Sequence, residues 1–261
     1  MLKGRLKYFL PYGLLIIIRK LREIYRIISF KRRSRKIIKS YFISTQIRKL
    51  QIGCGHNIIE GWYNTDMYPI NKRIMFLDAR KRFPFHNCTF NYIFCEHVIE
   101  HLEYREGILM LNECYRVLKP LGKIRISTPD LRFLIELYTK NKTNLQERYI
   151  RWLIDYFLPD PKNYSDTFVI NIFFRDWGHK FIYDYKTLKV ALEKTGFNNI
   201  SSYRPRESDD ENLKDLELRG YTVSHEFNEL DSLVLEGIKP ENMKNLTPKF
   251  LSAPLAMPKP V

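Results

Sequence analysis

The chain of 261 residues is long enough for one large domain with appendages. Its formal net charge of +15 is concentrated in residues 1–50, which hold 15 Lys or Arg and one acid, whereas the remainder holds 29 basic and 28 acidic residues. An enzyme that grips a phosphate backbone places positive charge beside its cleft, so we expect no nucleic-acid partner.

Cysteine usage bears on the compartment of the protein. The four cysteines, Cys54, Cys88, Cys95 and Cys114, form no C-x-x-C pair, and three of them fall in segments expected to be strand or helix. This pattern favours a reduced, cytoplasmic protein over a secreted one that is stapled by disulfides.

Residues 1–45 are expected to form a basic amphipathic helical arm. The apolar run 8–18 is too short to span a bilayer, and no signal-peptide cleavage site follows it. Apolar residues between Leu14 and Ile28 repeat at helical spacing, and a polybasic run occupies residues 31–36. We therefore predict that residues 1–40 bind an anionic membrane surface at the inner face of the cell membrane. A helix packed on the domain and an RNA contact are the alternatives.

The first expected strand, Leu50 to Ile52, ends in a glycine turn formed by Gly53, Cys54 and Gly55. Glycines at the end of a buried strand let backbone approach a ligand closely. A second apolar stretch closes at Asp66, and only ten residues separate it from Gly55. A full crossover helix does not fit there, so a short irregular connection is expected.

Further elements follow in regular alternation. Strands are expected at 74–79, 91–95, 123–127, 199–203 and 232–238, and helices at 108–118 and 185–195. Glu96 and His97 directly follow the fourth strand, where open parallel sheets bind their ligands.

Taken together, the glycine turn, Asp66, Asp78, Glu96-His-Val-Ile-Glu-His-Leu102 and Arg116-Val-Leu-Lys-Pro-Leu-Gly122 resemble the nucleotide-binding half of class I S-adenosylmethionine (SAM)-dependent methyltransferases. The resemblance implies an α/β fold with a doubly wound, mostly parallel seven-stranded sheet. The short Gly-Trp-x-Asn-x-Asp66 form is similar to a subset found among cell-surface polysaccharide biosynthesis enzymes.

The domain implied by this resemblance covers residues 46–239 and contains two insertions, 141–178 and 206–231. The first insertion is rich in aromatic residues, which suit either a carbohydrate acceptor or a local core. The tail 240–261 has five prolines and is expected to be disordered.

The resemblance also implies a set of site residues. SAM is expected to contact Gly53, Cys54 and Gly55, with Asp66 at the ribose, Asp78 and the Ala79 amide at the adenine, and Glu96 beside the transferred methyl group. The expected reaction is O-methylation of a sugar in a cell-surface glycan or its lipid-linked precursor. His97 is the first candidate for the general base, followed by His101 and His179, although His97 is equally interpretable as a structural residue. No metal ligand is assigned.

Two other functions stay open on the sequence alone. His97-Val-Ile-Glu-His101 also satisfies H-x-x-E-H, in which two histidines hold the zinc ion of a metallopeptidase. That interpretation leaves the glycine turn, Asp66 and Asp78 without a role. A non-catalytic SAM-fold binding subunit is the second alternative.

Overall fold

The computed structural model describes residues 21, 41–138, 141–158, 163–219 and 223–241. Seven strands are present, and their bounds are β1 (Lys49–Ile52), β2 (Tyr63–Asp66), β3 (Met75–Phe76), β4 (Phe90–Glu96), β5 (Leu118–Pro129), β6 (Asn198–Tyr203) and β7 (Ser232–Ile238).

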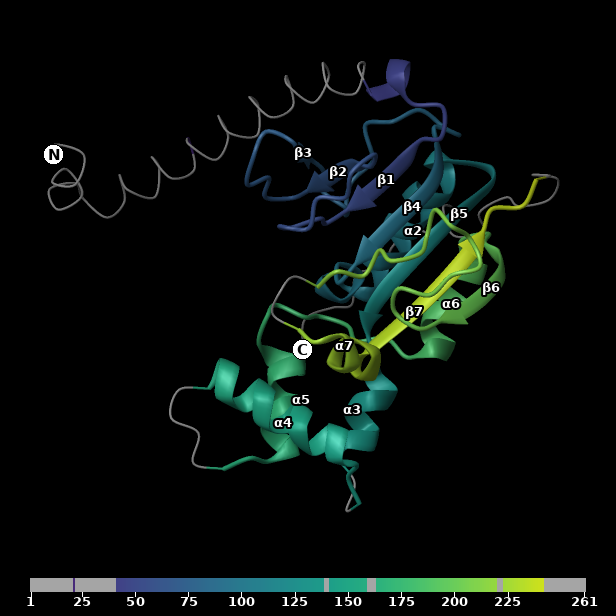
Figure 1. The fold of residues 1–261 in the computed structure, drawn as a ribbon. Coiled ribbons are helices and arrows are strands. Elements are labelled where there is room, and N and C mark those ends of the chain that lie inside the picture. Colours follow the sequence, from purple (N-terminus) through teal and green to yellow (C-terminus); the bar gives the residue numbers. More distant parts are fainter. Residues whose placement is uncertain (1–20, 22–40, 139–140, 159–162, 220–222, 242–261) are drawn as a thin grey trace, which may run out of the picture.

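All seven strands belong to one sheet, in the order β3-β2-β1-β4-β5-β7-β6 (Figure 1). Every pairing from β3 across to β5 is parallel, whereas β7 pairs antiparallel with β5 and with β6. The predicted doubly wound, mostly parallel seven-stranded sheet is confirmed.

Two strands differ in length from the prediction. β3 has only two residues, and β5 begins at Leu118 rather than at Lys123. The Pro-Gly segment before Lys123 is an irregular part of β5, in which Leu121 has a φ of 61° and the register with β4 shifts. Leu118 is the register partner of Phe90, and Gly122 accepts a hydrogen bond from the Lys239 amide at 2.9 Å.

The helices are η2 (Ile99–His101), α2 (Tyr104–Val117), α3 (Leu131–Leu137), α4 (Asn144–Phe157), α5 (Asp166–Arg175), α6 (Tyr185–Lys194) and α7 (His225–Asp231). A capping box between Glu103 and Glu106 starts α2 four residues before the predicted position. Only turns connect Ile52 to Tyr63, so the short crossover is confirmed.

The main core lies between the sheet and the helices α2 and α6, which pack on each other. Buried side chains of β1, β4 and β5 meet apolar residues of both helices there, and they include Leu50, Ile93, Ile124, Leu111 and Leu192. Tyr41 and Phe42 pack against the same core, so contact with the sheet begins before residue 46.

The opposite face of β4 and β5 is covered by residues 204–217, drawn in light green in Figure 1. Leu213 and Leu216 form an apolar cluster with Trp62 and Phe94. A doubly wound sheet needs cover on both faces, and this segment covers the face next to the helix-free crossover.

The remaining helices, α3, α4, α5 and α7, form a separate apolar cluster, which we call the cap. The cap lies beyond the end of β5, from which α3 follows directly (Figure 1). Tyr149 and Phe173 are buried in its core, while Tyr156 and Phe157 are exposed. Much of the aromatic insertion is therefore local core.

Most of the predicted arm and nearly all of the predicted disordered tail lie outside the described residues. Within the described part of the chain, none of the helices combines the length and the apolar character that crossing a membrane requires.

Candidate active site

The glycine turn after β1 is held in place by β2. Gly53 and Gly55 have positive φ values of 68° and 51°, which glycine adopts without strain. The Cys54 amide donates to the Thr65 carbonyl at 2.9 Å, and the Gly55 amide donates to the Asp66 carboxylate at 2.9 Å. The predicted cofactor residues of these two strands therefore form one contiguous group at their carboxyl ends.

The turn also contacts the segment after β4. The Val98 side chain fills the space that a Cβ atom on Gly53 would need. Cys54 is buried, and this burial, together with the nearby Asp66 charge, raises the pKa of its thiol to about 12. The Cys54 thiol therefore stays protonated and does not act as a nucleophile.

Asp78 lies after β3 and is paired with Arg80. The Arg80 Nε and Nη2 atoms donate to the two Asp78 carboxylate oxygens at 2.9 and 3.0 Å. Burial raises the pKa of Asp78, but the Arg80 hydrogen bonds outweigh it, and the pKa falls below its usual value. An adenine amino group would have to share this carboxylate with Arg80. The neighbouring Ala79 is buried in the main core.

The carboxyl ends of β4 and β5 hold three buried polar atoms with no hydrogen-bond partner among the described residues: Glu96 Oε1, His97 Nε2 and Ser127 Oγ. Glu96 and Ser127 are register partners across the two strands, and the His97 amide donates to the Ser127 carbonyl at 2.9 Å. Unpaired buried polar groups are costly, and a polar ligand that bonded to these atoms would remove that cost.

Glu96 connects these atoms to the glycine turn. Its second oxygen accepts a hydrogen bond at 3.4 Å from Asn57, which lies just beyond Gly55. Burial raises the pKa of Glu96 to about 8, with a further increase from Glu217 and an opposing effect of Arg219. A cationic ligand here would favour the ionised form of Glu96.

His97 and Glu100 form a hydrogen-bonded pair after β4. His97 has a φ of 49°, and its Nδ1 atom lies 3.0 Å from Glu100 Oε1, while Thr128 Oγ1 donates to Glu100 Oε2 at 3.0 Å. Burial raises the pKa of Glu100, but the hydrogen bond and charge of His97, together with His101, outweigh it and the pKa falls to about 2. Burial and the Arg219 charge lower the pKa of His97.

The two other predicted histidines lie beside Glu100. His101 ends η2, and His179 comes from the loop between α5 and α6; their ring centroids are 4.9 Å apart in an edge-to-face arrangement. The structure therefore gathers His97, His101 and His179 around one carboxylate. Glu100 itself was not predicted as a site residue, although it is the acid of the H-x-x-E-H pattern.

The zinc-peptidase interpretation of that pattern is not favoured. It requires His97 and His101 one turn apart on an α-helix. His97 instead precedes η2 with a left-handed φ of 49°, and η2 is a 3-10 helix of three residues.

Comparison with known proteins supports a methyltransferase fold. Residues 64–126, which extend from β2 into β5, match the family model described as "Methyltransferase domain". No curated protein matches the chain.

Solved structures similar to the chain include a phosphoethanolamine N-methyltransferase 2 from Haemonchus contortus, crystallised with S-adenosylhomocysteine, with 14% identity and a TM-score of 0.44. That match covers 75% of this chain and 50% of the other, so the chain spans about half the length of that enzyme. A SAM-dependent methyltransferase from Archaeoglobus fulgidus has 21% identity and a TM-score of 0.42, covering 88% of this chain and 100% of the other.

The matched segment includes Asp66 at the end of β2 and Glu96 at the end of β4. The strand order and the antiparallel β7 describe the same sheet. The described chain therefore has the fold of a class I methyltransferase domain.

Proposed function

We propose that the protein transfers the methyl group of SAM to a hydroxyl oxygen of a sugar, in a cell-surface glycan or its lipid-linked precursor. The observation that carries this proposal is the set of three unpaired buried polar atoms, Glu96 Oε1, His97 Nε2 and Ser127 Oγ, next to the glycine turn. They supply a carboxylate for a cationic cofactor and a ring nitrogen for a proton.

The cofactor would lie along the carboxyl ends of β1 to β4. Asp66 keeps lone pairs for ribose hydroxyls beyond its bonds to the Gly55 and Tyr68 amides. The adenine would extend toward Asp78 and Ala79, and the sulfonium would approach Glu96. An ionised carboxylate beside the sulfonium stabilises the positive charge that SAM carries and S-adenosylhomocysteine lacks.

The proposed base is His97, because its tautomer leaves Nε2 able to accept a proton. The Glu100 carboxylate only accepts hydrogen bonds, so His97 Nδ1 carries the hydrogen and Nε2 keeps its lone pair. The acceptor O–H proton would pass to Nε2 as the oxygen attacks the methyl carbon. The carbon–sulfur bond would break as the carbon–oxygen bond forms, so that sulfur keeps the electron pair and S-adenosylhomocysteine leaves.

A series of aromatic contacts supports a carbohydrate acceptor. His179 lies 5.5 Å from Trp177, Trp177 lies 4.9 Å from Phe157, and Phe157 lies 4.8 Å from Tyr156, all between ring centroids. The last two rings are exposed at the rim of the cap. Sugar ring faces stack on such side chains, so the series offers a path from the surface to the histidines.

The test combines binding and turnover. Wild-type protein should bind SAM in a calorimeter, and Asp78→Ala should weaken binding by about 1.5–3 kcal/mol, the scale of a hydrogen bond to a charged group. Radiolabelled methyl groups should transfer from SAM to one member of a panel of glycans and nucleotide sugars.

The base assignment has its own control. His97→Gln should lower the rate of transfer by about 10²–10⁴-fold and leave SAM affinity in place, whereas His225→Gln on the exposed part of α7 should change neither. Absence of SAM binding by the wild type would end the proposal. Binding without transfer to any acceptor would indicate the non-catalytic subunit instead.

A further inference from the structure

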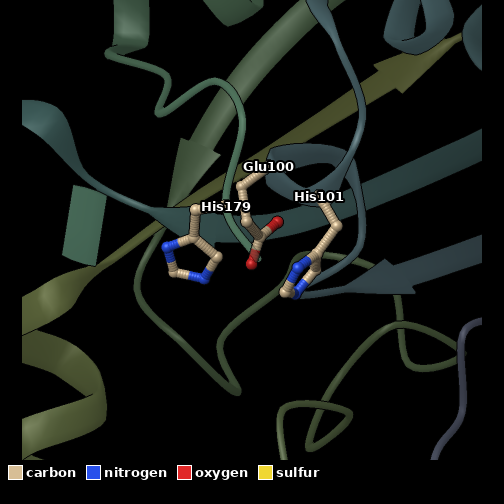
Figure 2. A group of neighbouring side chains, drawn as sticks. All are labelled: Glu100, His101 and His179. Carbon is tan, nitrogen blue, oxygen red and sulfur yellow. The ribbon is translucent and has the colours of Figure 1, made fainter. Parts of the chain in front are cut away.

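Glu100, His101 and His179 form a compact group of metal-ligating side chains. Figure 2 shows the Glu100 carboxylate between the two imidazole rings, and the three ligand atoms all lie within 4.8 Å of one another. Two of the residues come from η2 and the third from the loop between α5 and α6, so the group joins the sheet domain to the cap.

The His179 ring is already in the state that a metal requires. Its Nδ1 atom lies 2.7 Å from the Phe173 carbonyl oxygen, which can only accept a hydrogen bond. Nδ1 therefore carries the hydrogen, and Nε2 presents a lone pair. Metal-bound histidines usually donate their second N–H to a carbonyl or carboxylate in this way.

Glu100 supplies an uncompensated negative charge. Its side chain is fully buried, and its hydrogen-bond donors are His97 and Thr128. Among the described residues, no lysine or arginine forms an ion pair with this carboxylate. A buried carboxylate without a cationic partner is unfavourable, and a bound cation would remove that cost.

The backbone holds the two segments together without an ion. The amides of Lys180 and Phe181 both donate to the Glu100 carbonyl, at 2.7 and 3.1 Å. Glu100 is thus hydrogen-bonded to the loop that carries His179. This contact keeps the two metal-ligating side chains close before an ion binds. Preorganised ligands lose less conformational freedom when the ion arrives.

We propose that Glu100, His101 and His179 bind a divalent transition-metal ion, with Zn²⁺ as the expected occupant. Two imidazoles and one carboxylate suit zinc and its neighbours rather than Mg²⁺ or Ca²⁺, which prefer oxygen ligands. Two ligands at about 2.1 Å from one ion are at most about 4.2 Å apart, so a small rotation closes the site. The His101 ring makes no side-chain hydrogen bond with the described residues, and it is the ligand that moves.

Three protein ligands leave at least one coordination position open on the ion. This position would face the acceptor, whose hydroxyl would become more acidic on binding before its proton passes to His97. That role rests on the proposed methyl transfer, whereas the binding of the ion does not. His97 is not a ligand, which separates this site from the H-x-x-E-H pattern.

Zinc binding can be measured on the full-length protein after tag removal and dialysis against a chelator. Titration with ZnCl₂ should show one equivalent bound, and Co²⁺ in its place should give a visible absorption band of low-symmetry coordination. His179→Ala and His101→Ala should each weaken zinc binding by about 100-fold or more. Loss of an outer-sphere partner of a metal ligand already costs 10–100-fold, which sets the lower bound.

Matched controls are two histidines away from this site. His56→Ala and His86→Ala should bind zinc like the wild type, and zinc should raise the melting temperature of these controls but not that of His179→Ala. His179 lies outside the H-x-x-E-H pattern. Loss of zinc binding in His179→Ala would therefore distinguish the proposed site from a zinc site formed by that pattern.

S-adenosylhomocysteine binding, measured on the same samples, shows that the variants are folded. Zinc uptake that is absent in the wild type, or unchanged in the His101→Ala/His179→Ala double variant, would overturn the metal site. If S-adenosylhomocysteine still binds in that case, the proposed function survives without the ion.

Discussion

Arg125 Nε donates to Glu217 Oε1 at 2.5 Å, between two fully buried side chains that are 92 positions apart in the chain. Arg125 also pairs with Glu236 at 2.6 Å and donates to the Glu207 carbonyl at 2.8 Å. The guanidinium thus fastens residues 204–217 to β5 and β7. This contact keeps the second face of the sheet covered.

Removing one partner of the Arg125–Glu217 ion pair should destabilise the folded protein. Glu217→Ala leaves the Arg125 guanidinium with one carboxylate instead of two, and we expect a loss of about 3–5 kcal/mol in the free energy of unfolding. Urea denaturation measures it. Glu60→Ala, which breaks the exposed pair with Arg73, should cost about 0–1 kcal/mol. Equal losses in the two variants would contradict a buried, structurally important pair.

Gly53 and Gly61 allow a paired test of the glycine turn. Both have positive φ, but a Cβ on Gly53 would collide with Val98, whereas nothing lies within 4 Å of a Cβ on Gly61. Gly61→Ala should cost only the backbone strain, roughly 1–2 kcal/mol, and keep SAM affinity. Gly53→Ala should displace Val98 and weaken SAM binding at least tenfold. Calorimetric titration measures the SAM affinity of both variants. Equal affinities would show that the glycine turn does not contact the cofactor.

Glu96 should make stability depend on pH. Burial raises its pKa from 4.5 to about 8 in the folded protein, in the presence of Glu217, Arg219 and Glu100. Between these two values the folded chain holds a proton that the unfolded chain has lost. The contribution of Glu96 to stability is therefore complete below pH 4.5 and lost as pH rises toward 8.

Glu96→Gln removes this titration. Its free energy of unfolding relative to wild type should become more favourable by about 1 kcal/mol or more between pH 5 and pH 9, the equivalent of one pKa unit. Denaturation without cofactor at both pH values gives the difference. A flat difference, like that expected for the exposed Glu60→Gln, would show that Glu96 titrates normally.

The basic arm should bind membranes through charge and apolar contact together. Full-length protein should sediment with anionic vesicles and be released as salt rises, since the 15 basic residues among residues 1–50 face one acid. Deleting residues 1–40 should abolish sedimentation and leave SAM affinity intact, because the deletion ends before β1.

The apolar residues of the arm give a second readout. Ile17→Asp with Ile18→Asp keeps every Lys and Arg, yet should release the protein from vesicles. Normal binding by this variant, or aggregation of the truncated protein, would identify the arm as a packing element.

The sequence predicts the sheet well, because several parallel strands contain a short apolar run that ends at a glycine or an acid. Leu50 to Ile52 before Gly53 and the run before Glu96 are such cases. The short crossover follows from chain length alone. The inclusion of residues 118–122 in β5 does not, because Leu121 and Gly122 pair with Lys239, which is remote in sequence.

The site was only partly predictable for a related reason. His97, His101 and Glu96 follow one strand, so their proximity is local. His179 was predicted as a candidate base, but no pattern places it against Glu100. The contact depends on how the cap helices fold back. The burial of Arg125 is equally hidden, because an arginine in a strand predicts an exposed position until Glu217 is placed beside it.

The cover of the sheet by residues 204–217 also bears on how the chain is made. During synthesis, β1 to β5 emerge long before this segment and before β7, which then inserts between β5 and β6. Until that point Phe94 lacks the Leu213 and Leu216 side chains that pack against it. We expect ribosome-bound chains that end near residue 200 to remain open to proteases and chaperones. The nucleotide-binding half would then become protected from proteases only after β7 is made. Its sequence resembles a compact domain, but it would not fold independently.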